Sequence, residues 1–279
     1  MIIQIKNFIK YSPLGGIARK IAIPYFWLQY KISDTMAYLR KRGLVNPEKY
    51  QYIKNLKNTH QGERCFVVAT GPSLTFEDLD ALGNAHIYSF GMNSCALALD
   101  KTKWVPDMLG VQDEFVYDKI EKVLLKEAEC KLNGRVWVSD IVASICPSAR
   151  KFMQFPLHML NHKYNPKETG ELKFSEDCYS IIYDNYSIIF SILQLAVYMG
   201  FREIYLLGTD CNYNQKQQNF IDNGTKDPNR GILGNKLIYT HSLFKEFADT
   251  HGVKVVNCTR GGMLEVYPRM TLEEVLNIQ

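Results

Sequence analysis

Residues 63–79 read Glu-Arg-Cys-Phe-Val-Val-Ala-Thr-Gly-Pro-Ser-Leu-Thr-Phe-Glu-Asp-Leu and carry the signals of a strand, a tight turn and a helix start in succession. The continuous apolar run 65–69 is typical of a strand that is buried on both faces of a sheet. Gly71 and Pro72 end this run, because glycine adopts backbone angles that other residues avoid and proline fixes its own φ.

A helix start follows the turn. Ser73 or Thr75 can cap the first helical N–H groups, and Glu77 and Asp78 favour the positive end of the helix dipole. Such a strand, turn and helix start leave backbone N–H groups free, so a phosphate could bind at residues 70–73. A plain strand-to-helix turn without a ligand is the alternative, and this stretch alone leaves both interpretations open.

Strands and helices alternate along the rest of the chain. We expect further strands at 85–90, 108–111, 135–138, 203–207 and 253–257, and helices at 76–82, 117–130, 187–199, 240–251 and 271–276. This alternation predicts an α/β fold with a doubly wound, mostly parallel, Rossmann-like sheet. The predicted organisation is an N-terminal helical arm over 1–60 and a nucleotide-binding catalytic domain over 61–279, in which 147–180 and 211–240 form lid or acceptor segments.

Composition limits the cellular setting. The 279 residues are 46% hydrophobic, enough for a substantial core, and the seven cysteines include no CxxC pair. That pattern is typical of a reduced cytosolic protein rather than a disulfide framework or a zinc site. We find no signal peptide, and the apolar run 21–28 is far shorter than the roughly 20 residues of a membrane-spanning helix. The sequence therefore predicts a cytoplasmic location.

Charge is concentrated at the N-terminus. Residues 1–45 hold eight Lys and Arg but one acid, whereas the remainder has 25 basic and 28 acidic residues. This distribution argues against nucleic-acid binding and for a local anionic partner. Phe26, Trp27 and Tyr30 beside Lys31 suit the inner face of an anionic membrane. The alternative is an arm packed on the domain, with a solvated basic face.

Polar residues follow five of the predicted strands. The carboxyl ends of parallel strands meet at one edge of a sheet, where open α/β folds collect ligands. We therefore expect one crevice, lined by Thr70, Ser73, Asn93, Asp113, Asp210, Asn257 and Thr259. Asp113, alone or with Asp210, could hold Mg²⁺ against phosphates, since Mg²⁺ takes one or two carboxylates together with phosphate oxygens. Asp210 could instead bind a ribose hydroxyl or cap a loop.

His241 is the candidate general base. It opens the predicted helix 240–251 after a glycine- and asparagine-rich loop, and a neutral imidazole there could accept a proton from a hydroxyl. The alternative is a partly buried polar residue at a helix start. Tyr213, near that loop, could stabilise a departing phosphate. Neither GxxxxGK[ST] nor GxGxxG occurs, so P-loop kinase and standard dehydrogenase functions are disfavoured.

Several motifs together carry a resemblance. They are Gly-Glu-Arg-Cys-Phe-Val-Val-Ala-Thr-Gly-Pro-Ser-Leu (62–74), Gly-Met-Asn (91–93), Trp-Val-Pro-Asp with Gln-Asp (104–113), Met-Gly-Phe-Arg-Glu-Ile-Tyr-Leu-Leu-Gly-Thr-Asp (199–210) and Asn-Cys-Thr-Arg-Gly-Gly (257–262). Over about residues 60–276 the chain resembles the 6-hydroxymethylpterin diphosphokinase-like (MptE-like) Rossmann family. It is similar, more distantly, to bacterial sialyltransferases of glycosyltransferase family 42, which implies a variant of the GT-A fold.

The resemblance to sialyltransferases implies a cytidine-nucleotide site. Its first turn would be Thr70-Gly71-Pro72-Ser73, with Thr70 in place of the family's Asn, and Asn93 would contact the nucleotide. Further contacts would come from Ser187, where part of a Thr-Ser pair is replaced, and from Gly208-Thr209-Asp210, which matches a Gly-x-Asp motif. Asp113 falls where the family has Asn, which raises the case for a metal.

The same resemblance implies roles in catalysis. Tyr213 falls near the family's phosphate-facing tyrosines, and His241 falls near its catalytic histidine. The implied function is an inverting transfer from a CMP-linked, sialic-acid-like donor to a surface-polysaccharide or glycolipid acceptor, with His241 as base. The alternatives are a Mg²⁺-dependent diphosphokinase of the pterin type and a non-catalytic nucleotide-binding subunit. The sequence leaves the oligomeric state open.

Overall fold

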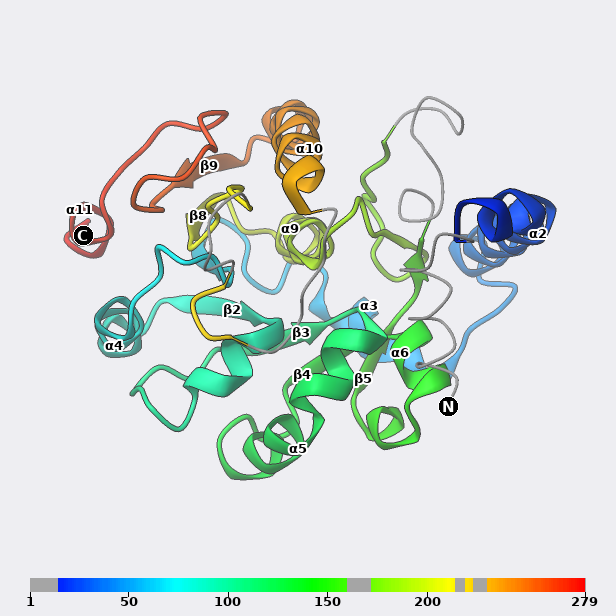
Figure 1. The fold of residues 1–279 in the computed structure, drawn as a ribbon, viewed down its shortest axis with the longest axis horizontal. Helices are drawn as coiled ribbons and strands as arrows, with labels where there is room; N and C mark the ends of the chain where they lie inside the picture. Colours follow the sequence, from blue (N-terminus) through cyan, green and yellow to red (C-terminus); the bar gives the residue numbers. More distant parts are fainter. Residues whose placement is uncertain (1–14, 160–171, 214–218, 223–229, 279) are drawn as a thin grey trace.

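The computed structural model describes residues 15–159, 172–213, 219–222 and 230–278. Their main feature is a seven-stranded sheet in the order β5-β4-β3-β2-β1-β8-β9, in which every neighbouring pair is parallel (Figure 1). Its strands are β1 (Arg64–Val68), β2 (Tyr88–Met92), β3 (Met108–Val111), β4 (Val136–Ser139), β5 (Met153–Phe155), β8 (Glu203–Leu207) and β9 (Lys254–Asn257). A separate parallel pair joins β6 (Leu157–His158) to β7 (Ile182–Tyr183).

Helices cover both faces of the sheet, which confirms the predicted doubly wound, Rossmann-like class. One face packs against α3 (Gln51–Leu56), α9 (Ile188–Met199) and α10 (Arg230–Thr250). The other packs against α4 (Phe76–Ala85), α5 (Glu114–Cys130), α6 (Asp140–Ile145) and α11 (Leu272–Leu276) (Figure 1). Short 3₁₀ turns complete the fold: η1 (Glu48–Tyr50), η2 (Asn93–Ala98) and η3 (Pro147–Lys151).

The side chains of β1 join two cores. Cys65 and Val67 lie in the core beneath α9 and α10, whereas Phe66 and Val68 lie in the core beneath α4 and α5. All four are fully buried. Alternation along a strand sends successive side chains to opposite faces, so only an unbroken apolar run satisfies both cores. The strand expected at 65–69 is therefore present as β1, an interior strand of the sheet.

The structure corrects two features of the predicted organisation. Helix α10 begins at Arg230, ten residues earlier than expected, so His241 lies in mid-helix and not at a helix start. A glycine-containing stretch was interpreted as loop, but Gly234 serves close packing: a Cβ there would lie 2.4 Å from the Cys211 carbonyl oxygen. The predicted lid over 147–180 holds strands β5 and β6, and β7 follows it directly, although residues 160–171 lie outside the described part.

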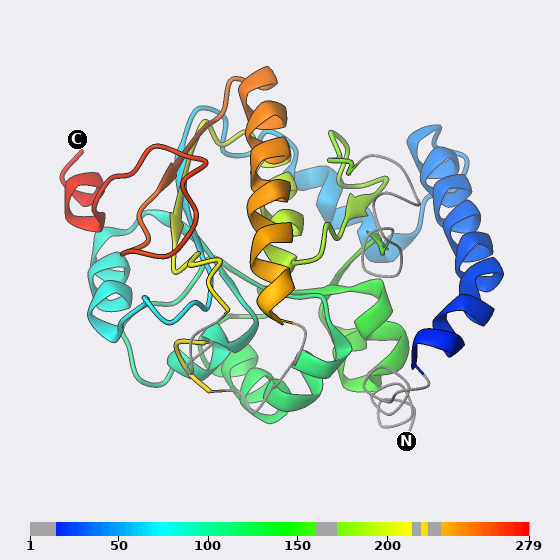
Figure 2. The same ribbon diagram turned by 45° about the horizontal axis from the view of Figure 1, so that its top comes forward.

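The N-terminal arm is the long helix α2 (Gly15–Lys41), at the far side of the molecule from α11 (Figure 2). Tyr30 stacks on His158 with ring centroids 5.1 Å apart. Arg40, 8% exposed, donates from Nε to the Ser180 carbonyl oxygen at 2.8 Å. The arm is thus docked on the β6–β7 segment. Across the described helices, we find none that combines the length and the apolar character needed to cross a bilayer.

Replacing Arg40 should loosen this docking. Arg40→Met keeps an apolar stem but removes two N–H donors from the buried Ser180 carbonyl. We expect a loss of about 1–3 kcal/mol in unfolding free energy and faster amide hydrogen exchange over residues 27–41. Lys41→Met, which changes the exposed neighbour, is the matched control. Equal exchange in the two variants would contradict the docking role.

Candidate active site

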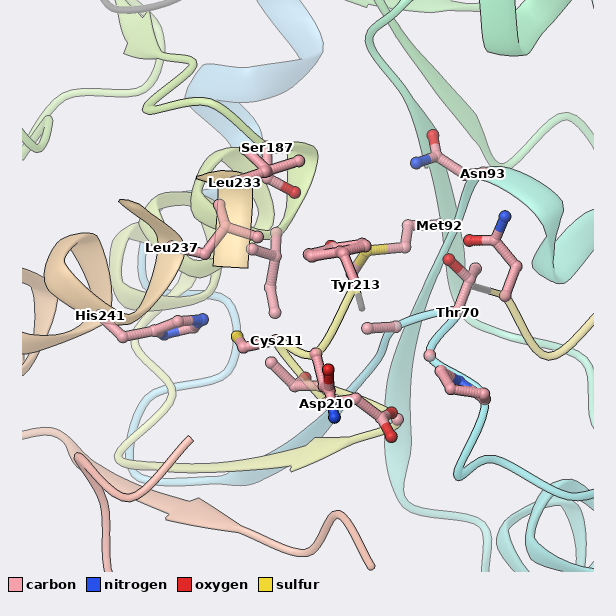
Figure 3. A pocket seen from close by; sticks show the side chains of 18 residues that line it. Thr70, Met92, Asn93, Ser187, Asp210, Cys211, Tyr213, Leu233, Leu237 and His241 are labelled. Atoms are coloured by element: carbon pink, nitrogen blue, oxygen red, sulfur yellow. The ribbon is translucent and has the colours of Figure 1, made fainter. Parts of the chain in front are cut away.

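The strand order reverses at β1, because β2 lies on one side of it and β8 on the other. Such reversals open a crevice at the carboxyl ends of the strands. A cavity of about 130 Å³ lies there, formed by the segments after β1, β2 and β8 together with α9 and α10 (Figure 3). Its lining includes the predicted residues Thr70, Gly71, Pro72, Asn93, Ser187, Gly208, Thr209, Asp210, Tyr213 and His241. Four residues predicted for the crevice lie outside this lining: Ser73, Asp113, Asn257 and Thr259.

The glycine turn packs against Asp210. The Ser73 hydroxyl donates to Asp210 Oδ2 at 2.7 Å, and a Cβ on Gly71 would lie 1.9 Å from the same oxygen. The same Cβ would lie 2.5 Å from the Gly208 carbonyl oxygen, and because this backbone atom cannot turn aside as a side chain can, glycine is required at position 71. Burial raises the pKa of Asp210, and hydrogen bonds from Ser73 oppose that shift. Ser73 is thus engaged inside the protein, and its predicted contact with a ligand phosphate has no support from this arrangement.

Two buried side-chain oxygens in the lining have no hydrogen-bond partner among the residues that the structure describes. They are Asn93 Oδ1, on a residue with φ of +49°, and Thr209 Oγ1. A buried polar atom without a partner costs free energy, so such atoms in a cavity wall point to a polar ligand. Asn93 was predicted from its position after strand β2, and Thr209 was predicted as part of the Gly-x-Asp motif of the family resemblance.

The residues after β9 have a different role. Thr259 Oγ1 accepts from the Thr209 N–H at 2.9 Å, and Asn257 Oδ1 accepts from the Thr259 N–H at 3.0 Å. Neither lines the cavity. Their predicted place in the crevice is wrong, because their side chains hold the neighbouring backbone in position.

Asp113 caps helix α5. Its Oδ1 accepts from the N–H groups of Phe115 at 2.8 Å and Val116 at 3.1 Å. In the described parts of the chain, we find no group of three or more His, Cys, Asp or Glu side chains placed to hold a metal ion. Asp113 thus has a structural role as a helix cap, and Mg²⁺ binding stays a prediction.

His241 reaches the cavity from the middle of α10. The side chain is fully buried, its ring lies 4.7 Å from that of Phe190, and Nδ1 lies 3.0 Å from the Tyr267 hydroxyl oxygen. The other ring nitrogen, Nε2, is buried and has no partner within the described part of the chain, and the ring points toward Cys211 in the cavity (Figure 3). Burial lowers the pKa of His241 to about 3, so the imidazole is neutral at physiological pH.

Tyr213 lies across the middle of the cavity (Figure 3). Pockets for small molecules typically measure roughly 300–1,000 Å³, so the cavity with this ring in place is small. Ser187 is the N-cap residue of α9, yet its side chain makes no capping hydrogen bond and lines the cavity instead.

Sequence reasoning missed the apolar half of the lining, which consists of Ala69, Met92, Ile189, Cys211, Leu233 and Leu237. Leu233 and Leu237 precede His241 at intervals of four residues, so all three lie on one face of α10. That spacing was available in the sequence, but it carries meaning only when the helix begins before residue 233.

Comparisons with known proteins were made for the whole chain. The 6-hydroxymethylpterin diphosphokinase MptE-like family matches residues 42–216, more than half of the chain. No curated protein gives a significant match.

Two solved structures are similar in fold. The MAf glycosyltransferase from Magnetospirillum magneticum AMB-1 aligns with a TM-score of 0.45 and 14% identity, over 83% of this chain and 39% of that one. The sialyltransferase CstII from Campylobacter jejuni, in complex with a substrate analogue, cytidine-5′-monophosphate, aligns with a TM-score of 0.43 and 12% identity. That second alignment covers 75% of this chain and 85% of CstII. Neither likeness assigns an activity to this chain.

The buried imidazole should make the protein sensitive to acid. Between pH 6.5 and 3 the unfolded chain binds a proton at His241 that the folded chain does not, so stability falls as the pH falls. The contribution lost between pH 7 and pH 5 is about 2 kcal/mol. In urea unfolding, the free energy of unfolding of His241→Gln should fall between pH 7 and pH 5 by about that much less than the free energy of unfolding of the wild type. Ser242→Ala, next to it on α10, should keep the wild-type loss, and identical losses in all three proteins would refute the assignment.

Proposed function

The chain belongs to the 6-hydroxymethylpterin diphosphokinase MptE-like family, and from this premise we propose that it is a glycosyltransferase that uses a nucleotide-activated sugar. One observation carries the proposal: the fully buried, neutral His241 brings an unpartnered Nε2 to a cavity at the carboxyl ends of β1 and β8. The motif resemblance to family 42 sialyltransferases supports a CMP-linked, sialic-acid-like donor. The acceptor would be a glycan or glycolipid.

The reaction needs one proton acceptor and one stabilised leaving group. The acceptor hydroxyl would give its proton to His241 Nε2 while its oxygen bonds to the anomeric carbon. The bond from that carbon to the phosphate oxygen breaks, and nucleoside monophosphate leaves with the electron pair. Attack opposite to the leaving group inverts the anomeric carbon. This chemistry requires an unprotonated nitrogen, which the lowered pKa of His241 supplies.

Four side chains could meet the nucleotide. Asn93 Oδ1 and the Thr209 hydroxyl lack partners, Thr70 lies in the turn after β1, and Tyr213 could donate its phenol hydrogen to the departing phosphate. The ring of Tyr213 would have to turn aside for a nucleotide to enter, because it lies across the cavity (Figure 3). Asp210 would keep the turn in shape by binding Ser73.

The name of the family favours a second candidate, a Mg²⁺-dependent diphosphokinase that transfers pyrophosphate from ATP. A non-catalytic nucleotide-binding subunit is the third. A thermal-shift panel of CMP, CDP, UDP, GDP and ATP, each with and without Mg²⁺, separates the three. Stabilisation by CMP in the absence of Mg²⁺ favours the glycosyltransferase. Stabilisation by ATP that occurs only when Mg²⁺ is present favours the kinase. Nucleotide binding without turnover of any donor favours the subunit.

His241→Gln should abolish transfer and spare nucleotide binding. Removing a general base costs on the order of 10²–10⁴ in rate, whereas the polar contacts to the nucleotide come from other residues. The assay is CMP release from CMP-sialic acid, with water or a glycan as acceptor, beside calorimetric binding of CMP. Ser242→Ala is the control on the same helix. A His241→Gln protein with wild-type CMP release would rule out the role of His241 as base.

We extend the proposal to the N-terminal arm, which would bring the enzyme to a lipid-linked acceptor at an anionic membrane. Trp27, Lys31 and Tyr38 fall on one stripe of α2, Arg42 follows in the turn after the helix, and both rings are 55% exposed. Lys31 Nζ lies 5.5 Å from the Trp27 ring centroid, and the Arg42 guanidinium lies 5.2 Å from that of Tyr38. Aromatic rings beside cations suit the headgroup region, where each cation contributes about 1 kcal/mol near anionic lipid.

Vesicle binding tests this surface. In a flotation assay, the full chain should rise with vesicles that contain phosphatidylglycerol. It should remain in the unbound fraction when the vesicles are pure phosphatidylcholine. The double variant Trp27→Ser with Tyr38→Ser should lose most of that binding, because it removes the two exposed rings. Tyr239→Ser, which removes a ring 57% exposed on α10, is the matched control. Binding that survives the double variant, or that ignores lipid charge, would overturn the assignment.

A further inference from the structure

The geometry points to Tyr267 as a positioning residue that fixes which nitrogen of His241 carries the proton. Its hydroxyl contacts both the ring and the backbone of that residue. The structural part of this inference concerns one hydrogen-bond pair and stands alone. The catalytic part rests on the proposed function, because it assumes that Nε2 of His241 accepts a proton from substrate.

The assignment follows from counting hydrogens. Tyr267 Oη lies 3.0 Å from the His241 carbonyl oxygen, which can only accept, so the single phenol hydrogen is used there. The same Oη lies 3.0 Å from His241 Nδ1. With the phenol hydrogen already engaged, this second contact is a hydrogen bond only if Nδ1 carries the proton and donates it. In a neutral imidazole the other nitrogen then has none.

The chosen tautomer is the one that a general base needs. Nε2 is the buried, unpartnered nitrogen, and the ring lies in the cavity lining. With the proton on Nδ1, Nε2 presents a lone pair and can accept a hydroxyl proton. With the proton on Nε2, the cavity would face a donor that cannot accept it. Phe190, against the ring, offers no competing hydrogen bond.

Tyr267 is itself held firmly. The side chain is 3% exposed and ends a loop that folds back on β9, where the Asn257 N–H donates to the Pro268 carbonyl at 2.9 Å. Arg269 donates to the carbonyl oxygens of Thr259 at 2.7 Å and Gly261 at 2.8 Å. Hydrogen bonds to backbone atoms at both ends of the loop hold the phenol in position, so its hydroxyl contacts His241 without rearrangement.

The same loop also supports Asp210, the carboxylate of the cavity lining. The Met263 N–H donates to the Asp210 carbonyl oxygen at 2.8 Å, and a Cβ on Gly262 would lie 2.9 Å from Asp210 Cα. Residues 258–269 therefore contact and support both His241 and Asp210. This explains why a loop that lines none of the cavity is packed so closely against it.

Nitrogen NMR tests the tautomer without any substrate. The two ring nitrogens of a neutral histidine differ in ¹⁵N shift according to which one is protonated, and the His241→Gln spectrum identifies the His241 signals. We expect the wild type to show a protonated Nδ1 and an unprotonated Nε2 at pH 7. Tyr267→Phe should shift the population toward the other tautomer. Tyr52→Phe, which also removes a phenol donor to a backbone carbonyl at 3.0 Å, should leave it unchanged.

Kinetics test the catalytic part. In CMP release from CMP-sialic acid, Tyr267→Phe should lower kcat about tenfold or more and leave KM within twofold, while Tyr52→Phe keeps both. A protonated Nε2 in the wild type overturns the proposal, and so does an unchanged tautomer or kcat in a folded Tyr267→Phe. The wild-type spectrum decides the tautomer even where that variant fails to fold. Should no donor turn over, the proposed function fails while the spectrum still decides the role of Tyr267.

Discussion

The parallel pairing of β1 with β8 is the constraint from which the cavity follows. The two strands are in register from Arg64 opposite Glu203 to Val68 opposite Leu207, and the pairing continues past their ends. The Ala69 N–H donates to Leu207 and the Gly71 N–H donates to Gly208, both at 2.8 Å. The two turns therefore leave the sheet side by side. Because β2 and β8 flank β1, the helices that follow them lie on opposite faces and leave a crevice between.

Close approach of these two turns determines which residues they can contain. Gly208 has a φ of +67°, and a Cβ there would lie 2.9 Å from the Ala69 carbonyl oxygen. Gly71 leaves room for the Asp210 carboxylate. At both turns, glycine thus allows the backbone to approach a neighbouring group closely. The N–H groups of the turn then face protein atoms. A ligand phosphate would rely on side chains of the cavity wall as much as on the turn.

How much could be predicted from the sequence depends on whether local pattern or tertiary contact decides an element. The strands β3 and β8 were predicted with their exact bounds in the apolar runs 108–111 and 203–207, because strands buried on both faces leave an unbroken signal. Helix α10 was predicted too short, since Gly234 satisfies a tertiary contact with Cys211 that local propensity does not reveal. The rule that polar residues follow strands located Asn93 and Asp210 in the cavity wall. It could not distinguish them from Asp113, which follows β3 in the same way but uses its carboxylate to cap helix α5.

Burial also decides how His241 can respond to a substrate. Desolvation by the surrounding protein disfavours imidazolium, and no carboxylate accepts a hydrogen bond from either ring nitrogen among the described contacts. In a site of low effective dielectric, however, a charge that appears nearby acts far more strongly than in water. A phosphate that becomes more negative as its bond to the sugar breaks would stabilise imidazolium at that moment. The residue would then be a weak base before the reaction and a stronger one as the leaving group departs, so that proton transfer is coupled to bond cleavage.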